Sequence, residues 1–163
     1  MQTRLKVGSE SKLKILVAKG CFEPVGGAER DIMRAIPSLI ERFEVSVATL
    51  RPSKELEKLC SNLGLKLLTP NDPWIVPNGI LDEMLHRKQR ASFHAWAKVP
   101  GIRDELAIVD GIHLVSGDGS IGILRLVGSE TRVHVHYLEP DRGLHENVLH
   151  LDVRGKPKRP MII

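Results

Sequence analysis

The chain has few aromatic residues, few cysteines and no long hydrophobic run. Phe, Trp and Tyr make up 4% of its 163 residues, too few for the platforms on which single-stranded nucleic acids stack. Its two cysteines, Cys21 and Cys60, make no disulfide framework and lack the spacing of a metal site. No apolar run approaches the roughly 20 residues that cross a bilayer, and the N-terminus has no signal-peptide core. We expect a cytoplasmic protein with reduced cysteines and no nucleic-acid partner.

The length and the charge set further bounds. A chain of 163 residues is long enough for one domain. We expect a flexible polar leader at residues 1–12, a domain at 13–153 and the start of a continuation at 154–163. The net charge of +4 is mildly basic, which suits an anionic ligand or a membrane surface.

The first fifty residues show a strand–helix–strand pattern with a glycine-rich turn. A strand is expected at residues 14–18, which are apolar from Ile15 onward, as is typical of a strand buried on both faces of a parallel sheet. Residues 20–27 hold three glycines and a proline, which predicts a loop. From Ala28 the apolar residues recur at helical spacing, with Pro37 as an expected kink. Residues 45–50 are rich in β-branched residues and predict the next strand.

The rest of the chain continues this alternation. We expect helices at 52–63, 80–98, 102–109 and 121–127, with Ser53 and Ser120 as N-caps of the first and the last. Strands are expected at 65–68, 110–116 and 131–136. This order predicts an α/β fold, a Rossmann-like three-layer sandwich with a mostly parallel sheet.

The turn at Gly26 and Gly27 is a candidate ligand site. Glycine lets a ligand approach the backbone, and the following helix points free amides at it, which suits a phosphate or a hydroxyl. Arg30 could bond an oxyanion bidentately. The loop matches neither GxxxxGK[ST] nor GxGxxG, and no acidic residue ends the second strand, so a dinucleotide site is not expected. A tight turn without a ligand is the alternative.

The histidines form the second candidate site. His134 and His136 lie two residues apart on one strand and therefore share a face. This spacing is compatible with metal binding, but the sequence fixes no third ligand and we expect no metal. His136 lies at the carboxyl edge of the sheet, where α/β proteins bind ligands, and its neutral imidazole can bond a hydroxyl. A histidine in a surface loop is the alternative, and His113 is expected to be structural.

One stretch resembles a known family. The pattern F-x-P-x-GGAER at residues 22–30, followed by a helix and the strand FEVSVAT, is similar to the N-terminal domain of GT-B glycosyltransferases, more narrowly the retaining group 1 / family 4 branch. The stretch DGIHLVS at residues 110–116 also resembles a strand of that family. The resemblance covers nearly the whole chain but about half of such an enzyme, and the Glu-x7-Glu motif of the donor-binding domain is not found.

This resemblance implies transfer of a sugar from a nucleotide-sugar donor to a sugar or lipid-linked hydroxyl acceptor, without a metal or another cofactor. It makes His136 the candidate catalytic residue and places Gly26 and Gly27 at the cleft between two domains. Glu139, in the polar loop after His136, would contact the acceptor. Because the donor-binding domain or a partner chain would be missing, we expect this chain alone to be inactive.

Three alternatives stay open. The chain could be a non-catalytic binding module or the acceptor-side subunit of a two-chain glycosyltransferase. It could instead be an unrelated Rossmann-like nucleotide-binding protein, against which the lack of phosphate-loop signatures argues.

The expected helix at 80–98 carries basic residues among apolar ones. It is either an outer helix with a solvated face or a peripheral contact with the inner face of the membrane.

Overall fold

A computed structural model of the protein describes residues 11–77 and 87–137. The described elements follow in the order β1 (Lys14–Cys21), α1 (Gly27–Arg42), β2 (Glu44–Arg51), α2 (Lys54–Leu63), β3 (Lys66–Leu68), α4 (Arg87–Ala97), α5 (Ile102–Ile108), β4 (Gly111–Val115), the 3-10 helix η1 (Ser120–Leu126) and β5 (Arg132–His136).

The five strands form one sheet in the order β3-β2-β1-β4-β5, and all neighbouring strands are parallel. The predicted α/β fold is therefore confirmed, with a sheet that is parallel throughout its described strands. The chain leaves β1 toward β2 and β3 and then returns to the other side of β1 to form β4. The strand order thus reverses between β1 and β4, and in folds of this kind such a reversal marks the ligand-binding crevice.

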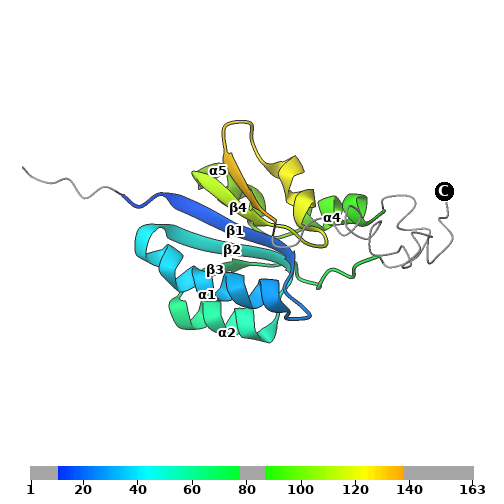
Figure 1. The fold of residues 1–163 in the computed structure, drawn as a ribbon. Helices are drawn as coiled ribbons and strands as arrows, with labels where there is room; N and C mark the ends of the chain where they lie inside the picture. The colour runs from blue at the N-terminus through cyan, green and yellow to red at the C-terminus, as the bar shows by residue number, and fades with distance from the viewer. Residues whose placement is uncertain (1–10, 78–86, 138–163) are drawn as a thin grey trace, which may run out of the picture.

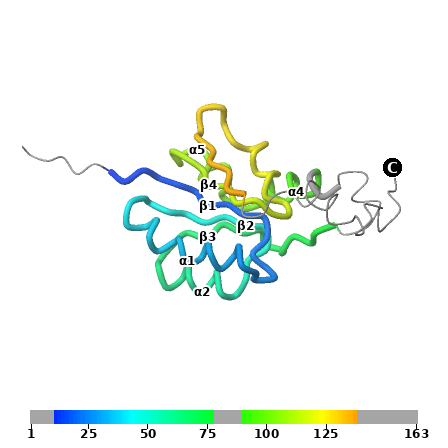
Figure 2. Tube along the Cα trace, in the orientation of Figure 1, coloured from blue at the N-terminus to red at the C-terminus, as the bar shows by residue number. Residues whose placement is uncertain are grey.

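Helices cover both faces of the sheet, which gives three layers (Figures 1 and 2). On one face α1 and α2 bury an apolar cluster that includes Val17, Ile36, Val47 and Leu56. On the other face α4, α5 and η1 bury a cluster around Trp96. The mostly apolar sequences of β1 and β2 follow from this burial on both faces.

Two helix ends can be compared with the sequence. Ser53 is the N-cap of α2 as predicted, and its Oγ accepts a hydrogen bond from the backbone N–H of Leu56 at 3.2 Å. Ser120 is not an N-cap, because Gly119 holds that position of η1 and the fully buried Ser120 bonds elsewhere. The segment expected as a helix at 121–127 is a 3-10 helix that starts at Ser120. Pro37 lies inside α1, which continues beyond it to Arg42.

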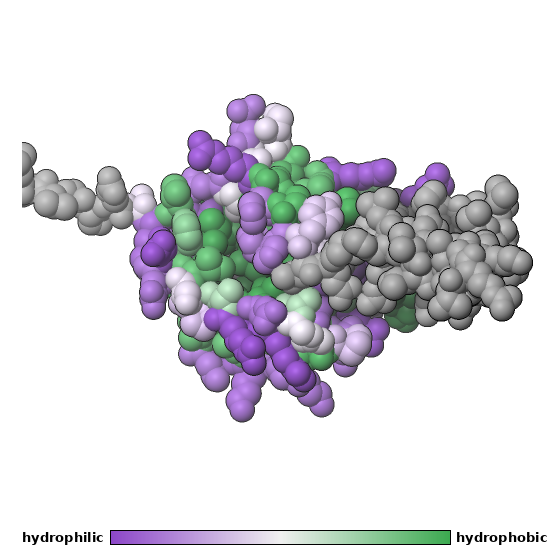
Figure 3. Space-filling model, in the orientation of Figure 1, coloured by the Kyte–Doolittle hydropathy of each residue, from purple (hydrophilic) through white to green (hydrophobic). Residues whose placement is uncertain are grey.

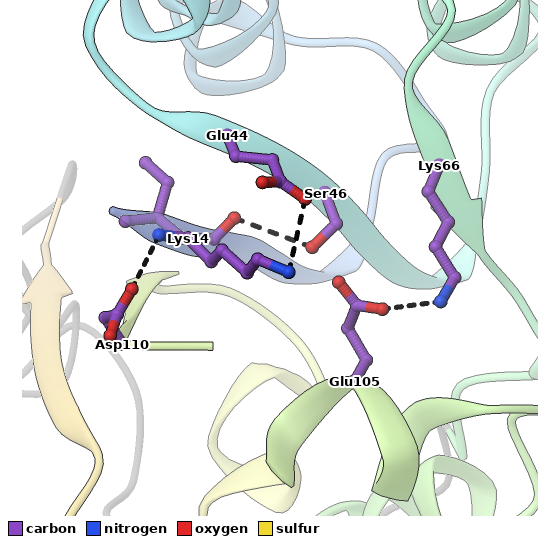
Figure 4. A network of polar contacts seen from close by, with 7 residues as sticks. Lys14, Glu44, Ser46, Lys66, Glu105 and Asp110 are labelled. Atoms are coloured by element: carbon purple, nitrogen blue, oxygen red, sulfur yellow. Dashed lines mark hydrogen bonds and ion pairs between the residues drawn. The ribbon is translucent and has the colours of Figure 1, made fainter. Parts of the chain in front are cut away.

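The amino edge of the sheet is held together by polar contacts (Figure 4). The carboxylate of Asp110, which precedes β4, accepts a hydrogen bond from the backbone N–H of Lys14 at 2.7 Å. On β3, the neighbour of β2, Lys66 bonds the carboxylate of Glu105 from α5 at 2.5 Å, and the Glu105 side chain is 7% exposed. These contacts tie the strand starts together at the edge opposite the one where ligands bind.

Several expectations fall outside the described residues. These are most of the leader at 1–12, residues 80–86 of the basic helix, the end of the domain expected at 13–153, Glu139 and the continuation at 154–163. Within 11–77 and 87–137, no helix has the length and apolar character needed to cross a bilayer.

Candidate functional site

The candidate site lies at the carboxyl edge of the sheet, where β1, β4 and β5 end. Gly26 and Gly27 begin α1 directly after the loop that leaves β1, and His136 is the last residue of β5. Because all described strands are parallel, these residues lie at the same edge. The structure therefore brings the two predicted candidate regions to one side of the molecule.

The turn at Gly26 and Gly27 is organised by a side chain of its own helix. Gly26 is the N-cap of α1, and its backbone N–H donates a hydrogen bond to Oε2 of Glu29 at 2.8 Å. One of the amides expected to be free for a ligand is therefore already bonded within the protein. A Cβ atom at Gly27 would meet no heavy atom within 4 Å, so the space beside Gly27 is open. Arg30, one residue beyond Glu29, is exposed.

Glu29 also pairs with a buried lysine at the end of β1. Nζ of Lys19 lies 3.2 Å from Oε1 of Glu29, and the two side chains are 5% and 14% exposed. The same ammonium group donates a hydrogen bond to the backbone oxygen of Ser116, after β4, at 2.8 Å. Lys19 thus links the end of β1, the start of α1 and the end of β4. A buried cation is stable only with such partners.

The charge of Glu29 is set by these contacts. Burial alone would raise the pKa of its carboxyl, but hydrogen bonds from the backbone amides of Glu29 and Gly26 and the charge of Lys19 outweigh burial and lower the pKa. Glu29 is therefore ionised at neutral pH. A carboxylate that is ionised at neutral pH and already bonded suits a structural role in the turn rather than proton transfer.

The crevice between β1 and β4 is filled by the protein itself. The loop after β4 passes so close to Gly20 that a Cβ atom there would lie 2.0 Å from the backbone oxygen of Asp118. Ser120 of this loop accepts a hydrogen bond from the backbone N–H of Gly20 through its Oγ at 2.9 Å. Trp96 donates its indole N–H to the backbone oxygen of Gly119 at 2.8 Å. A ligand at this edge must therefore lie further out, on the side of α1 and β5.

A small hollow lies there, between α1 and the strands β1, β4 and β5. Its volume is about 70 Å³, and it is lined by Val17, Asp31, Ile32, Ala35, Leu39, His113 and His136. This space holds a few water molecules but is much smaller than the roughly 300–1,000 Å³ of a complete small-molecule pocket. The hollow can therefore accept one chemical group of a ligand. Its wall is mostly apolar, and His113, His136 and Asp31 are its polar side chains. Figure 3 shows hydrophobic surface on this side of the molecule beside the mostly hydrophilic outer surface of α1 and α2.

The three histidines of β4 and β5 are neighbours. His113 pairs with His134 in the register of the two strands, and Val115 pairs with His136. The ring centroid of His113 is 5.0 Å from that of His134 and 5.6 Å from that of His136. As predicted, His134 and His136 lie on one face. His113 joins them, which the sequence did not indicate because the pairing of β4 with β5 cannot be read from spacing.

Neither metal ligands nor cysteines form a further site among the described residues. In the described part of the chain, no group of three or more His, Cys, Asp or Glu side chains is arranged to hold a metal ion. Cys21 and Cys60 are free. Burial and the nearby carboxylate of Asp118 raise the pKa of the Cys21 thiol to about 11, so at neutral pH Cys21 is a protonated thiol and not a nucleophile.

Sequence reasoning missed Lys19, Gly20 and Glu29 as parts of this site. Lys19 directly follows the predicted strand at 14–18, and a lysine at the end of a buried strand was the available signal.

Comparison of the chain with models of known protein families finds no match, and comparison with curated proteins finds none either.

Proposed function

We propose that this chain is the acceptor-side domain of a glycosyltransferase that uses a nucleotide-sugar donor. The proposal rests on the resemblance of residues 22–30 to GT-B enzymes and on one arrangement. The open Gly27 turn and His136 lie at the same edge of a parallel sheet, where ligands of α/β folds bind. The hollow next to His136 and α1 supplies room for one hydroxyl-bearing group of a ligand.

The roles of the residues follow from their surroundings. The imidazole of His136 would bond a hydroxyl of the acceptor and orient it toward the donor. Gly27 would allow close approach of the sugar or the donor phosphate to the backbone, with Arg30 as an exposed cation beside it. Lys19 and Glu29 would hold the turn in place without touching the ligand. Glu139 remains a proposed acceptor contact outside the described residues.

Most of the contacts with the nucleotide-sugar would come from a second domain or a partner chain. The chain itself is then expected to bind an acceptor and to be inactive in transfer. No metal or other cofactor is part of the proposed reaction. A non-catalytic binding module and the acceptor-side subunit of a two-chain enzyme share this acceptor-binding surface.

A membrane contact belongs to the same proposal, at the cytoplasmic side of the membrane. The apolar side chains of α4 are part of the core, where Ala91 and Ala95 pack against the cluster that contains Trp96. These side chains are therefore not free to enter a bilayer. Contact with anionic lipids would therefore be electrostatic, through exposed residues such as Arg90 and Lys98. Sedimentation with anionic liposomes at low salt tests it, and absence of binding would remove this part of the proposal.

The decisive experiment is ligand-observed NMR on the chain at neutral pH. Saturation-transfer spectra would be recorded with a panel of mono- and oligosaccharides and lipid-linked acceptor analogues, with nucleotide-sugars, and with NAD and FMN. We expect saturation transfer to at least one acceptor saccharide, reduced in His136→Ala and kept in His94→Ala, whose histidine lies on α4. Tight binding of NAD or FMN, or no transfer to any saccharide, would overturn the proposal.

A further inference from the structure

The edge strand β5 is joined to β4 by a contact between two imidazoles. Nδ1 of His134 lies 2.9 Å from Nδ1 of His113, which is a hydrogen-bond distance. The ring planes differ by 15° and the centroids are 5.0 Å apart, so the rings direct their Nδ1 edges at each other. The function proposed above uses His136 but leaves this pair without a role.

The geometry of the pair fixes how many protons it can carry. A hydrogen bond between two Nδ1 atoms needs one N–H and one bare nitrogen. A first additional proton can bind the far nitrogen of the donor ring, and the bond then becomes charge-assisted. A second proton must bind the accepting Nδ1, which removes the bond and places two like charges against each other. Full protonation of the pair is therefore incompatible with the contact.

The surroundings decide which ring stays neutral. His113 is half-buried, and burial, followed by the charges of His134 and His136, lowers the pKa of its imidazole from the usual 6.5. His134 is exposed, so His113 is the more buried of the two rings. Because burial favours the neutral form of an imidazole, we assign His113 as the acceptor, with its proton on Nε2.

Other charged groups face this part of the sheet from two elements. Asp31 of α1 lines the hollow beside His113, but its carboxylate already has Arg34 at 3.7 Å. Arg132 lies two residues before His134 on β5, so its side chain starts on the same face. On β1, the neighbour of His113 in register is the apolar Val17. Among the residues that the structure describes, these neighbours offer one carboxylate, already paired, against Arg132 and the three imidazoles.

Loss of the hydrogen bond between His113 and His134 would weaken the attachment of the edge strand β5. Within the described residues, β5 pairs with β4 alone, over Arg132–His136. We propose that the hydrogen bond between His113 and His134 is an acid-sensitive link that holds the edge strand β5, and with it His136, on the sheet. Acidification through the pKa of His113, which burial holds below the usual 6.5, favours a state in which the accepting ring is protonated and β5 is detached. The inference does not depend on the glycosyltransferase proposal, since it concerns only β4 and β5.

The test combines tautomer assignment with hydrogen exchange, on the whole chain and in the presence of EDTA. Long-range ¹H–¹⁵N spectra at pH 7 should show His113 protonated on Nε2 and a proton on Nδ1 of His134. Exchange of the β5 amides, corrected for intrinsic rates and referred to β2, should increase severalfold between pH 7 and pH 5, because only the detached strand accepts the second proton without loss of the bond. The β2 amides report whether the protein stays folded.

His134→Gln supplies the matched variant, because the glutamine amide can donate its N–H to neutral His113 and, after rotation, accept a hydrogen bond from protonated His113 through its oxygen. It should abolish the pH dependence of β5 exchange, while His94→Gln on α4 should leave it unchanged. Independent titration of His113 and His134 near pH 6.5, or equal β5 exchange at pH 7 and pH 5, would overturn the proposal. The same holds if His134→Gln keeps the pH dependence, or if EDTA changes the histidine signals, since a metal and not a proton would then join the rings.

Discussion

Lys19 and Glu29 form a 3.2 Å ion pair that is almost closed to solvent, and the Glu29 carboxylate also accepts the N–H of Gly26. One acidic side chain therefore connects the end of the first strand to the turn that we propose as a ligand site. This contact makes the stability of the protein and the shape of the turn depend on the same two residues.

Removal of the lysine charge should destabilise the protein. Lys19→Met leaves the Glu29 carboxylate largely buried without its cation, and we expect a loss of about 2–3 kcal/mol, below the roughly 3–5 kcal/mol of a fully buried pair. Equilibrium urea unfolding measures it. Lys14→Met is the control, because Lys14 and Glu44 are 42% and 64% exposed and such pairs contribute about 0–1 kcal/mol. The double variant Lys19→Met/Glu29→Gln should recover part of the loss, and equal effects of Lys19→Met and Lys14→Met would contradict the prediction.

Stability should fall with acidification through two carboxylates. Burial opposes ionisation of Glu29 and Glu105, yet hydrogen bonds and a nearby lysine lower the pKa of both below the usual 4.5. A carboxyl with a lowered folded-state pKa stabilises the fold above its unfolded value, and this contribution is lost as the pH falls through the folded value. Urea unfolding between pH 6 and pH 3 should show a decrease that begins near pH 4.5. Glu29→Gln should flatten part of that decrease, and an unchanged slope would contradict the assignment.

Two glycine-to-alanine variants should separate folding from binding. At Gly20 a Cβ atom would meet backbone atoms at 2.0 and 2.7 Å, so Gly20→Ala should cost roughly 1–3 kcal/mol or more, as overpacking does. At Gly27 the space is open and the residue begins α1, so Gly27→Ala should keep or slightly raise stability. If a ligand approaches Gly27, this variant binds saccharide more weakly although it is fully folded. Unchanged saccharide binding in Gly27→Ala would remove Gly27 from the site.

Cys21 should react slowly with alkylating reagents at neutral pH. Its thiol has a pKa raised to about 11 by burial and by Asp118, so the reactive thiolate is scarce. Iodoacetamide labelling followed by mass spectrometry should show a rate that rises with pH through pH 9. Asp118→Asn, which removes the second cause, should increase the rate at pH 8. Fast labelling of folded wild-type protein at pH 7 would show that the thiol is not protected.

The sequence predicted the elements well where hydrophobic pattern alone decides them. The sequences of β1 and β2 are mostly apolar because both faces of the sheet are covered, and this pattern is visible in one dimension. Ser53 was found because an N-cap bonds to a residue three positions away. Such signals are local and need no knowledge of which strands are neighbours.

The site was predicted only in part, because its contacts are long-range. Ser120 has the residue type of an N-cap, but its hydroxyl is used by Gly20, one hundred residues away in sequence. His113 was expected to be structural, yet register places it opposite His134. Lys19 stands just past the predicted strand end, where a charged residue usually marks a loop. In each case the partner is set by strand order, which residue spacing does not encode.

The loop that fills the crevice between β1 and β4 also bears on the kinetics of binding. Since Gly117 to Ser120 already occupy that space and are bonded there, a ligand on the side of α1 and β5 needs no segment within 11–77 and 87–137 to open first. Association should then be governed by diffusion and orientation rather than by a slow conformational step. A weak saccharide ligand would exchange rapidly, and in a titration its resonances would shift progressively instead of splitting into free and bound sets.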